Sequence, residues 1–513
     1  MVGQPNILFV MTDQQRFDTL AALGNRLIHT PNLDRLVARG AYFSNAYSTC
    51  PVCMPARYTL MSGCEPPSTG VWKNMIYPDM HQTIERRCGR YLPRVLRDLG
   101  YRTFGIGKFH TFPWDAPLGF ETQLYGEEMY DDEAQRSQDA YVSYILREHP
   151  QYAWVEALMG ERTEMYYMPQ MSPFPANLTM EAWAVDRAVE LLRVRDGRPW
   201  FGFVSFVGPH PPFAPPQPFN RIYDPDRMPN PVRGDPSVDH RDQQIPLMNR
   251  LIWADGINDS HARVLKARYY GEITYIDWCL GRLLDFVETS AGAENTLICF
   301  FSDHGEHLGD HGAWQKESYF EASARVPLLV SWPRRIPPGE RRELVCLTDL
   351  FGLATAAAGR AELRQGTGLL DLLEGRAAGR EALFGYYGVP GQHDFKLMVR
   401  QGRWKLICFA NGGQTQLFDV EADPLELTDL SDTETQVRAR LSAAGAAQLA
   451  RMGCEAALEG GALRSLPFKD WQAQIAESPY REYFPNGRIH QFDVSTGMQA
   501  FPRHPREVLE RQT

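Results

Sequence analysis

Several stretches of the chain begin as short apolar runs and end abruptly in polar residues. Four of them lie at residues 6–14, 101–110, 200–213 and 295–307. Runs this hydrophobic are typical of strands that are covered on both faces, as in a parallel sheet between two layers of helices. Because ligands of such sheets bind at the carboxyl ends of the strands, we expect the four polar ends to meet at one edge.

Helical patterns separate these predicted strands. One begins with Thr30 as a candidate N-cap and Pro31 at the first helical position, and it ends at Gly40. Helical spacing also covers residues 178–195 and 261–288, each of which precedes a predicted strand. Strands that alternate with helices predict an α/β sandwich with a large, mostly parallel sheet.

The pattern changes in the last quarter of the chain. Residues 395–409 and 415–431 favour short strands joined by tight turns, which predict a small antiparallel sheet. We therefore divide the chain into a catalytic domain at 1–385 and a C-terminal subdomain at 386–513. The tail from about 465 to 513 is rich in aromatic residues, and we expect it to pack on the body or on another subunit of a dimer or tetramer.

Two long segments, 112–180 and 212–258, are rich in Tyr, Trp, Met and Pro but show no clear periodicity. Segments of this kind are usually lids or specificity loops. We expect substrate preference to reside there, although neither segment carries a motif that would name the substrate.

Net charge narrows the range of binding partners, and cysteine content indicates the redox compartment. A formal net charge of -10 at pH 7 disfavours nucleic acid and anionic membranes as partners, because both attract basic surfaces. Nine cysteines without a recurring paired spacing favour a reducing compartment over a disulfide framework. The apolar run from Ile7 to Met11 is too short for a signal sequence or a membrane span. We expect a cytoplasmic protein that binds neither nucleic acid nor a membrane.

Two aspartates directly follow predicted strands, each beside another potential metal ligand. Asp13 precedes Gln14, and Asp303 precedes His304. Together these side chains predict a divalent-cation site, in which the excess of oxygen ligands favours a hard ion and the imidazole inclines the choice toward Mn2+. The alternative is that the two aspartates only cap the turns that follow.

A pair of cysteines, Cys50 and Cys53, has a spacing that would suit a redox pair or half of a zinc site. Pro55 and Arg57, which follow closely, serve neither purpose. Pro55 lies where a helix would begin, and helical spacing continues to Gly63. Cys53 would then lie at a helix N-terminus, where free N–H groups attract an anion, and Arg57 would point back toward the same place.

The pattern Cys-x-Pro-x-Arg, filled by Cys53, Pro55 and Arg57, resembles the signature of the sulfatase family, within the alkaline-phosphatase-like superfamily. Other segments resemble family counterparts in the same order, among them HTPNLDRLVARGAYFSNAYST, GKFH, PHPPF and NTLICFFSDHGEHLGDHGAWQKE. The resemblance covers roughly residues 4–430. It implies an alkaline-phosphatase-like α/β/α sandwich, followed by a smaller C-terminal domain with a short antiparallel sheet.

In that family the motif cysteine is oxidised after translation to formylglycine, an aldehyde that hydrates to a geminal diol. The resemblance therefore implies that Cys53 is a precursor converted by a formylglycine-generating enzyme, whereas Cys50 lacks the required proline and arginine. One hydroxyl of the diol would attack sulfur, and the second would then expel sulfate and restore the aldehyde. A serine has a single hydroxyl and therefore no second hydroxyl with which to expel sulfate.

The resemblance also implies one cation site and a ring of catalytic side chains. The positions that match the family's ligands for one divalent cation, with Ca2+ as the default and Mn2+ as the alternative, are Asp13, Gln14, Cys53, Asp303 and His304. The positions that match catalytic or sulfate-binding residues are Arg57, Lys108, His110, His210 and Lys316. Within this set, His110 is the expected base, and His210 with Lys316 would bind sulfate oxygens and assist the leaving oxygen. Asn74 is expected to touch the substrate.

Two features bear on the choice of substrate. Gln14 stands where many family members have a second aspartate, a change shared with choline-sulfatase-like enzymes and phosphonate monoester hydrolases. Phosphonate hydrolases tend to lack the pair that stands here as Lys108 and His110. We therefore expect hydrolysis of aryl or small alkyl sulfate monoesters, with hydrolysis of phosphonate monoesters or phosphodiesters as the alternative, and activity toward both.

Two other hypotheses are less favoured. The repeated stretch DHGEHLGDHG could hold a second metal through His307 or His311, but such a site needs another Asp-rich box, and the region around Asp349 has no histidine. A sulfatase-like binding protein or a thiol–metal protein would keep Cys53 unmodified and would not depend on it.

Overall fold

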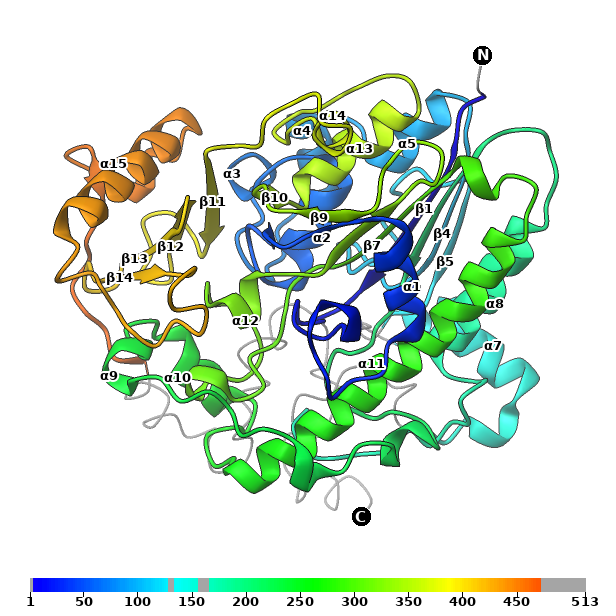
Figure 1. The fold of residues 1–513 in the computed structure, drawn as a ribbon, viewed down its shortest axis with the longest axis horizontal. Coiled ribbons are helices and arrows are strands. Elements are labelled where there is room, and N and C mark those ends of the chain that lie inside the picture. Colours follow the sequence, from blue (N-terminus) through cyan, green and yellow to red (C-terminus); the bar gives the residue numbers. More distant parts are fainter. Residues whose placement is uncertain (1–2, 128–132, 156–165, 472–513) are drawn as a thin grey trace.

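The apolar runs of the sequence form the centre of one large sheet (Figure 1). The computed structural model describes residues 3–127, 133–155 and 166–471. The strands of this sheet, in spatial order, are β5 (Thr122–Tyr125), β4 (Arg102–Gly107), β6 (Trp200–Ser205), β1 (Asn6–Thr12), β7 (Thr296–Ser302), β8 (Leu328–Ser331), β2 (Ala41–Phe43) and β9 (Gly339–Arg341). All neighbours pair in parallel except β8, which is antiparallel to β7 and β2. The predicted mostly parallel sheet is confirmed.

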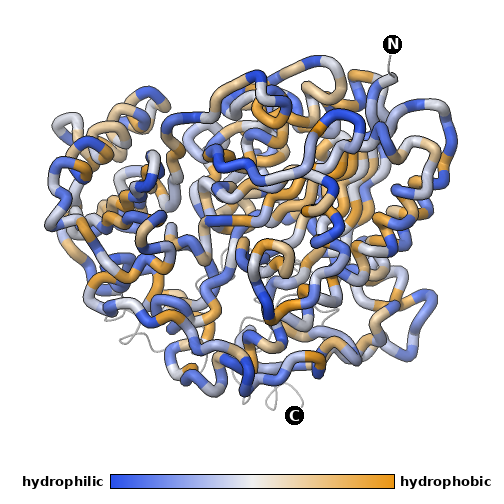
Figure 2. The backbone as a smooth tube through the Cα atoms, viewed as in Figure 1, coloured by the Kyte–Doolittle hydropathy of each residue, from blue (hydrophilic) through white to orange (hydrophobic). Residues whose placement is uncertain are grey.

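Helices cover both faces of this sheet because β1 is apolar on both. Ile7 and Phe9 contribute to one core, and Leu8 and Val10 contribute to the other. In Figure 2 the central strands are predominantly hydrophobic. The helices of the first core are α2 (Cys53–Ser62), α4 (Met80–Cys88), α5 (Leu92–Asp98), α13 (Thr348–Ala357) and α14 (Leu369–Leu373). The helices of the second core are α1 (Pro31–Arg39), α7 (Ala140–Glu148), α8 (Met180–Leu192) and α11 (Asp259–Glu288). The α/β/α sandwich is therefore confirmed.

A second, antiparallel sheet follows the sandwich. Its strands are β11 (Ala382–Tyr387), β12 (Lys396–Gln401), β13 (Trp404–Phe409) and β14 (Thr415–Asp419). Helix α15 (Thr435–Arg451) packs on one face through Leu441 and Leu449. The opposite face joins a core with Tyr319 and Phe320 of the sandwich. The antiparallel sheet is confirmed and begins close to the predicted boundary at residue 385, whereas most of the predicted arm lies outside the described residues.

Some local predictions differ from the structure. Thr30 occupies the N-cap position of α1, as predicted, but its hydroxyl donates to Asp34 and accepts from the N–H of Ala21, so it makes no side-chain capping hydrogen bond. Helix α2 begins at Cys53, two residues before Pro55. This offset is permitted because none of the first helical N–H groups has an intrahelical acceptor, so proline is tolerated there.

The two segments without periodicity contain short elements of their own. Besides β5, α7 and the start of α8, the α-helices among them are α6 (Glu133–Gln138), α9 (Pro236–Asp239) and α10 (Gln244–Leu251). The remaining short α-helices and strands are β3 (Ala46–Tyr47), α3 (Pro66–Thr69), α12 (Glu321–Ala324), β10 (Val345–Cys346), β15 (Leu458–Glu459) and β16 (Ala462–Leu463). Within the described ranges, no helix combines the length and apolar composition that crossing a membrane requires.

Strand register aligns the carboxyl ends of the central strands. Thr12 of β1 lies opposite Ser302 of β7, and Met11 lies opposite Ser205 of β6. Gly107 of β4 also lies opposite Ser205. The polar residues that follow these strands therefore leave the sheet at one edge, as the sequence predicts.

Candidate active site

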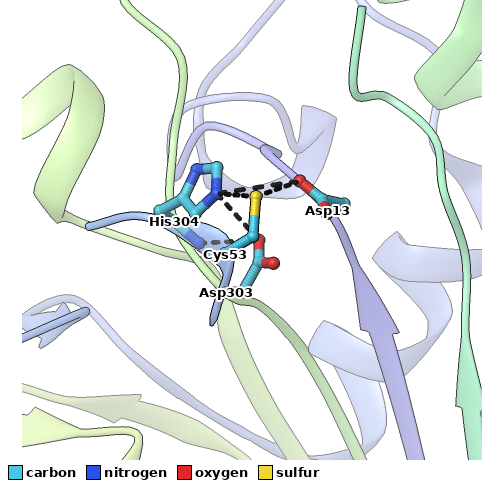
Figure 3. A group of neighbouring side chains, drawn as sticks. All are labelled: Asp13, Cys53, Asp303 and His304. Carbon is cyan, nitrogen blue, oxygen red and sulfur yellow. Dashed lines mark hydrogen bonds and ion pairs between the residues drawn. The ribbon is translucent and has the colours of Figure 1, made fainter. Parts of the chain in front are cut away.

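Four buried side chains meet beyond the carboxyl ends of β1 and β7. Asp13 follows β1, Asp303 and His304 follow β7, and Cys53 opens α2 (Figure 3). One potential ligand atom from each lies within 4.8 Å of the others. The structure thus brings together four of the five residues predicted to bind a cation.

Hydrogen bonding turns the imidazole of His304 toward this cluster. Its Nδ1 lies 3.0 Å from the carbonyl oxygen of Gly305, and because a carbonyl only accepts, Nδ1 carries the proton and Nε2 keeps a lone pair. Nε2 lies 3.7 Å from Oδ1 of Asp13 and 3.6 Å from Oδ1 of Asp303. Electron-rich atoms that converge in a buried place are stabilised by a cation between them. The donor set of two carboxylates and one neutral imidazole fits a divalent cation.

The fifth predicted ligand, Gln14, lies beside the cluster. Its backbone N–H donates to Oδ1 of Asp303 at 3.0 Å, and its side-chain Oε1 accepts from Nζ of Lys316 at 2.6 Å. Gln14 has a φ of 70°, in the left-handed region that non-glycine residues rarely adopt. Strain of this kind, of about 1–3 kcal/mol, persists where the surroundings hold the residue in place.

Cys53 faces the cluster from the first turn of α2. Val52 before it is extended, and Sγ of Cys53 lies 3.2 Å from Nε2 of His304 and 3.7 Å from Oδ1 of Asp13. Burial, reinforced by the carboxylate of Asp13, raises the pKa of the Cys53 thiol well above its ordinary value. The predicted position at a helix N-terminus is confirmed.

Arg57, one turn into α2, holds the outer oxygens of both carboxylates. Its Nε donates to Oδ2 of Asp303 at 3.1 Å, and its Nη2 donates to Oδ2 of Asp13 at 2.9 Å. Its Nη1 donates to the carbonyl of Lys108 at 2.6 Å and to Oγ of Ser205 at 3.0 Å. The guanidinium therefore connects the carboxyl ends of four strands and leaves Oδ1 of each aspartate toward the cluster.

Lys108 places a second buried cation against Asp13, with Nζ 2.6 Å from Oδ2. Burial alone would raise the pKa of Asp13, but the charges of Lys108 and Arg57 outweigh it and hold that pKa well below its ordinary value. Asp13 is therefore a carboxylate at neutral pH, as a metal ligand must be.

Two imidazoles, His110 after β4 and His210 after β6, lie near cationic side chains of the site. Burial, together with the charges of Lys108 and Lys316, lowers the pKa of both imidazoles well below their ordinary value. Nδ1 of His210 lies 2.8 Å from the carbonyl of Pro211, so Nδ1 donates there and Nε2 keeps its lone pair. Both imidazoles are neutral at neutral pH and able to accept a proton.

The remaining candidates lie at the border of the site or outside it. Oδ1 of Asn74 accepts from the N–H of Met54 at 3.0 Å, which ties this exposed residue to the first turn of α2. The buried thiol of Cys50 donates to the carbonyl of Trp72 at 3.4 Å.

The histidines considered for a second metal make other bonds. Nε2 of His307 lies 2.7 Å from Oγ of Ser318, and Nδ1 of His311 lies 3.1 Å from Oδ1 of Asp239. Within the part of the chain that the structure describes, the group around Asp13 is the one set of three or more potential ligands that converges. The described residues therefore give the second site no support.

Two carboxylates beside the site were not predicted. Glu306, within the polar run after β7, accepts from the side-chain amide of Gln14. Glu127 accepts from the backbone N–H of Phe109 at 2.6 Å and of His110 at 3.0 Å. His110 has a φ of 50°, so Glu127 helps to hold a strained backbone. The position of Glu306 in the polar run after a predicted strand gives a weak sequence signal for a place near the site. Glu127 lies in a segment without clear periodicity, which gives no such signal.

Replacing Glu127 by glutamine should make stability less dependent on pH. Burial raises the pKa of Glu127 from 4.5 to about 7, so the folded protein keeps a proton between these values that the unfolded chain releases. Wild-type stability therefore falls as the pH rises through about 7, whereas the amide introduced by Glu127→Gln does not titrate. We expect the free energy of unfolding of Glu127→Gln, relative to wild type, to rise by about 2 kcal/mol from pH 5 to pH 8, allowing for the partial exposure of Glu127. Urea denaturation at both pH values measures this difference.

The exposed carboxylate Glu459 offers a control, because Glu459→Gln should leave the wild-type pH dependence in place. An equal difference between Glu127→Gln and wild type at both pH values would contradict the raised pKa of Glu127.

Comparison with known proteins identifies the family of this chain. The family model described as Sulfatase matches residues 5–359, and the model described as N-sulphoglucosamine sulphohydrolase, C-terminal, matches residues 309–452. The chain is 29% identical over 456 residues to an arylsulfatase of Clostridium perfringens, covering 84% of this chain and 91% of the relative. It is 30% identical over 459 residues to a choline-sulfatase of Rhizobium meliloti, covering 84% of this chain and 83% of the relative.

Solved structures share the fold. The phosphonate monoester hydrolase of Agrobacterium radiobacter superposes with a TM-score of 0.71 at 24% identity, covering 88% of this chain and 96% of that one. A phosphonate monoester hydrolase of Silicibacter pomeroyi gives 0.72 at 20% identity, covering 90% and 99%. The family model spans more than half of the chain, and we conclude that this protein belongs to the sulfatase family and is a hydrolase of that family.

Proposed function

We propose that this protein hydrolyses sulfate monoesters of aryl or small alkyl alcohols. The observation that carries the proposal is the position of Cys53, at a helix N-terminus and in contact with the convergent ligand atoms of Asp13 and His304. A nucleophile derived from Cys53 would there face both a cation site and the basic side chains that an anionic ester needs.

The cation would be held by Oδ1 of Asp13, Oδ1 of Asp303, Nε2 of His304 and Oε1 of Gln14, with modified Cys53 completing the set. Oxygen donors dominate this set, which favours Ca2+, and the imidazole makes Mn2+ the alternative. When bound, the ion supplies positive charge that favours a deprotonated nucleophile.

Cys53 would act after conversion to formylglycine by a formylglycine-generating enzyme. The hydrated aldehyde offers one hydroxyl for attack on sulfur and a second for release of sulfate. The motif around Cys53 supports this conversion, and the position of Cys50, away from the cluster, leaves it no comparable role.

The side chains around Cys53 have complementary tasks. Lys316, Lys108 and Arg57 would bind the oxygens of the ester and the charge that develops on them. Lys316 is the better proton donor to the leaving oxygen, because Nε2 of His210 carries a lone pair. His110, neutral at neutral pH, would accept the proton when sulfate is released. Asn74 would contact the substrate from the border of the site.

Hydrolysis of phosphonate monoesters or phosphodiesters is the second candidate, and Gln14 in place of a second acidic ligand is compatible with it. The two candidates are separated by comparing kcat/KM for nitrophenyl sulfate and for nitrophenyl phenylphosphonate, on protein produced with the converting enzyme. We expect the sulfate ester to be preferred and the phosphonate ester to be turned over as well.

Mass spectrometry of the peptide containing residue 53 monitors conversion, in which the side chain loses one sulfur and two hydrogens and gains one oxygen. Preference for the phosphonate would favour the second candidate. Converted protein that turns over neither ester would refute both.

A further inference from the structure

We propose that Glu306 fixes the side-chain amide of Gln14 with its oxygen toward the cation site and thereby sets the affinity of that site. The inference rests on the cation site of the proposed function. It assigns Glu306 a positioning role, since Glu306 acts through Gln14 and does not touch the cluster itself.

The carboxylate of Glu306 is fully buried and surrounded by donors. Its Oε1 accepts from the N–H of Leu308 at 3.0 Å and of Gln315 at 2.9 Å. Its Oε2 accepts from the hydroxyl of Tyr167 at 2.8 Å and from Nε2 of Gln14. Glu306 is therefore held from two sides and offers Gln14 a fixed acceptor.

The amide of Gln14 lies between two groups of opposite hydrogen-bonding character. Oε1 accepts from the ammonium of Lys316 at 2.6 Å, while Nε2 donates to Glu306. An ammonium only donates and a carboxylate only accepts, so a flipped amide would set donor against donor and acceptor against acceptor. This arrangement allows a single orientation, with Oε1 on the side of Lys316 and Nε2 on the side of Glu306. Of these two atoms, only the oxygen has a lone pair with which to bind a cation.

Of the two side chains that orient the Gln14 amide, Lys316 and Glu306, only Glu306 has no other proposed task. Lys316 is also proposed to bind the substrate, so its bond to Gln14 competes with another task. Glu306 is bound only to protein groups in the contacts described above, and Gln14 carries no charge of its own. Partners of this kind orient metal ligands, and their loss typically weakens metal binding about 10–100-fold.

The first test is the variant Glu306→Gln, which preserves size but places an amide where the carboxylate stood. Calorimetric titration of the metal-stripped full-length protein with Ca2+ and with Mn2+ measures cation affinity without any turnover. We expect Glu306→Gln to bind about 10–100-fold more weakly than wild type. Tyr167→Phe removes another donor to the same carboxylate oxygen but leaves Gln14 bonded, and its affinity should stay within about threefold of wild type.

A double variant that exchanges the carboxylate and the amide between positions 14 and 306 keeps the test decisive if Glu306→Gln does not fold. In Gln14→Glu/Glu306→Gln, the amide introduced at position 306 can donate to the carboxylate introduced at position 14, so the hydrogen bond between the two positions is kept with donor and acceptor exchanged. We expect this double variant to bind the cation at least as tightly as wild type. Unchanged affinity in Glu306→Gln, an equal loss in Tyr167→Phe, or a double variant as weak as Glu306→Gln would each overturn the inference.

The same titrations distinguish failure of the proposed cation site from failure of the role of Glu306. If the cation site fails, wild type and Asp13→Asn would bind the two cations equally weakly, and Glu306 would have no site to influence. Loss of binding in Asp13→Asn together with wild-type affinity in Glu306→Gln would overturn the role of Glu306 alone.

Discussion

Replacing Cys53 by alanine should abolish sulfate-ester hydrolysis. We expect kcat for nitrophenyl sulfate to fall by about 10,000-fold or more, as on removal of other covalent nucleophiles. Alanine has no oxygen with which to attack sulfur, while the cations that would bind the ester remain. Substrate binding should therefore persist, and the loss should appear in kcat rather than in KM. Steady-state kinetics with converted wild type as reference measures both.

Cys53→Ser and Cys50→Ala sharpen this test. Serine supplies one hydroxyl but no second one for release, so Cys53→Ser should give at most one product molecule per active site and then stop. Cys50→Ala removes a buried thiol that bonds only to the carbonyl of Trp72 among the described contacts, and it should retain activity within a few-fold.

A protein that acts as a binding module or through its thiol would respond differently. Cys53→Ala would then lose no function, and active preparations would retain the thiol at Cys53. Either result, obtained on protein with a wild-type thermal unfolding profile, would remove the basis for assigning catalysis to this position.

Much of the site could be predicted because it lies where strands end. The run before Asp13 is apolar on both faces, so it had to be a buried strand, and the same holds for the run before Asp303. Parallel register then aligns Thr12 with Ser302, which brings the two aspartates to the same edge. Continuous apolar runs that end abruptly in polar residues therefore carry enough information to place Asp13, Asp303 and the histidine that follows.

Other parts depend on contacts that no local pattern encodes. Glu306 meets Gln14 across more than half of the chain length, and Glu127 reaches Phe109 from an irregular segment. The start of α2 was misplaced by two residues because proline is acceptable at several positions of a first helical turn, so Pro55 alone does not mark its beginning. Packing between distant segments decides such details.

Removing the guanidinium of Arg57 should destabilise the protein strongly. Its donors satisfy Oδ2 of both Asp13 and Asp303, and all three side chains are buried. Breaking a buried ion pair from one side typically costs about 3–5 kcal/mol, because a charge stays behind without a partner. We expect Arg57→Ala to lose about that much free energy of unfolding in urea with a chelator present. Arg57→Lys should lose less, since it keeps the charge but not the planar fork.

Arg35→Ala is the matched control, because Arg35 pairs at the surface with Asp285 and Glu288 and should change stability by no more than about 1 kcal/mol.

Adding a divalent cation separates the stabilising role of Arg57 from its proposed catalytic role. Ca2+ at about a hundredfold excess over its Kd should raise the stability of Arg57→Ala by about 2.7 kcal/mol without restoring turnover. If Arg57→Ala instead matches wild type in the presence of chelator, the pairing of Arg57 with Asp13 and Asp303 does not stabilise the folded protein.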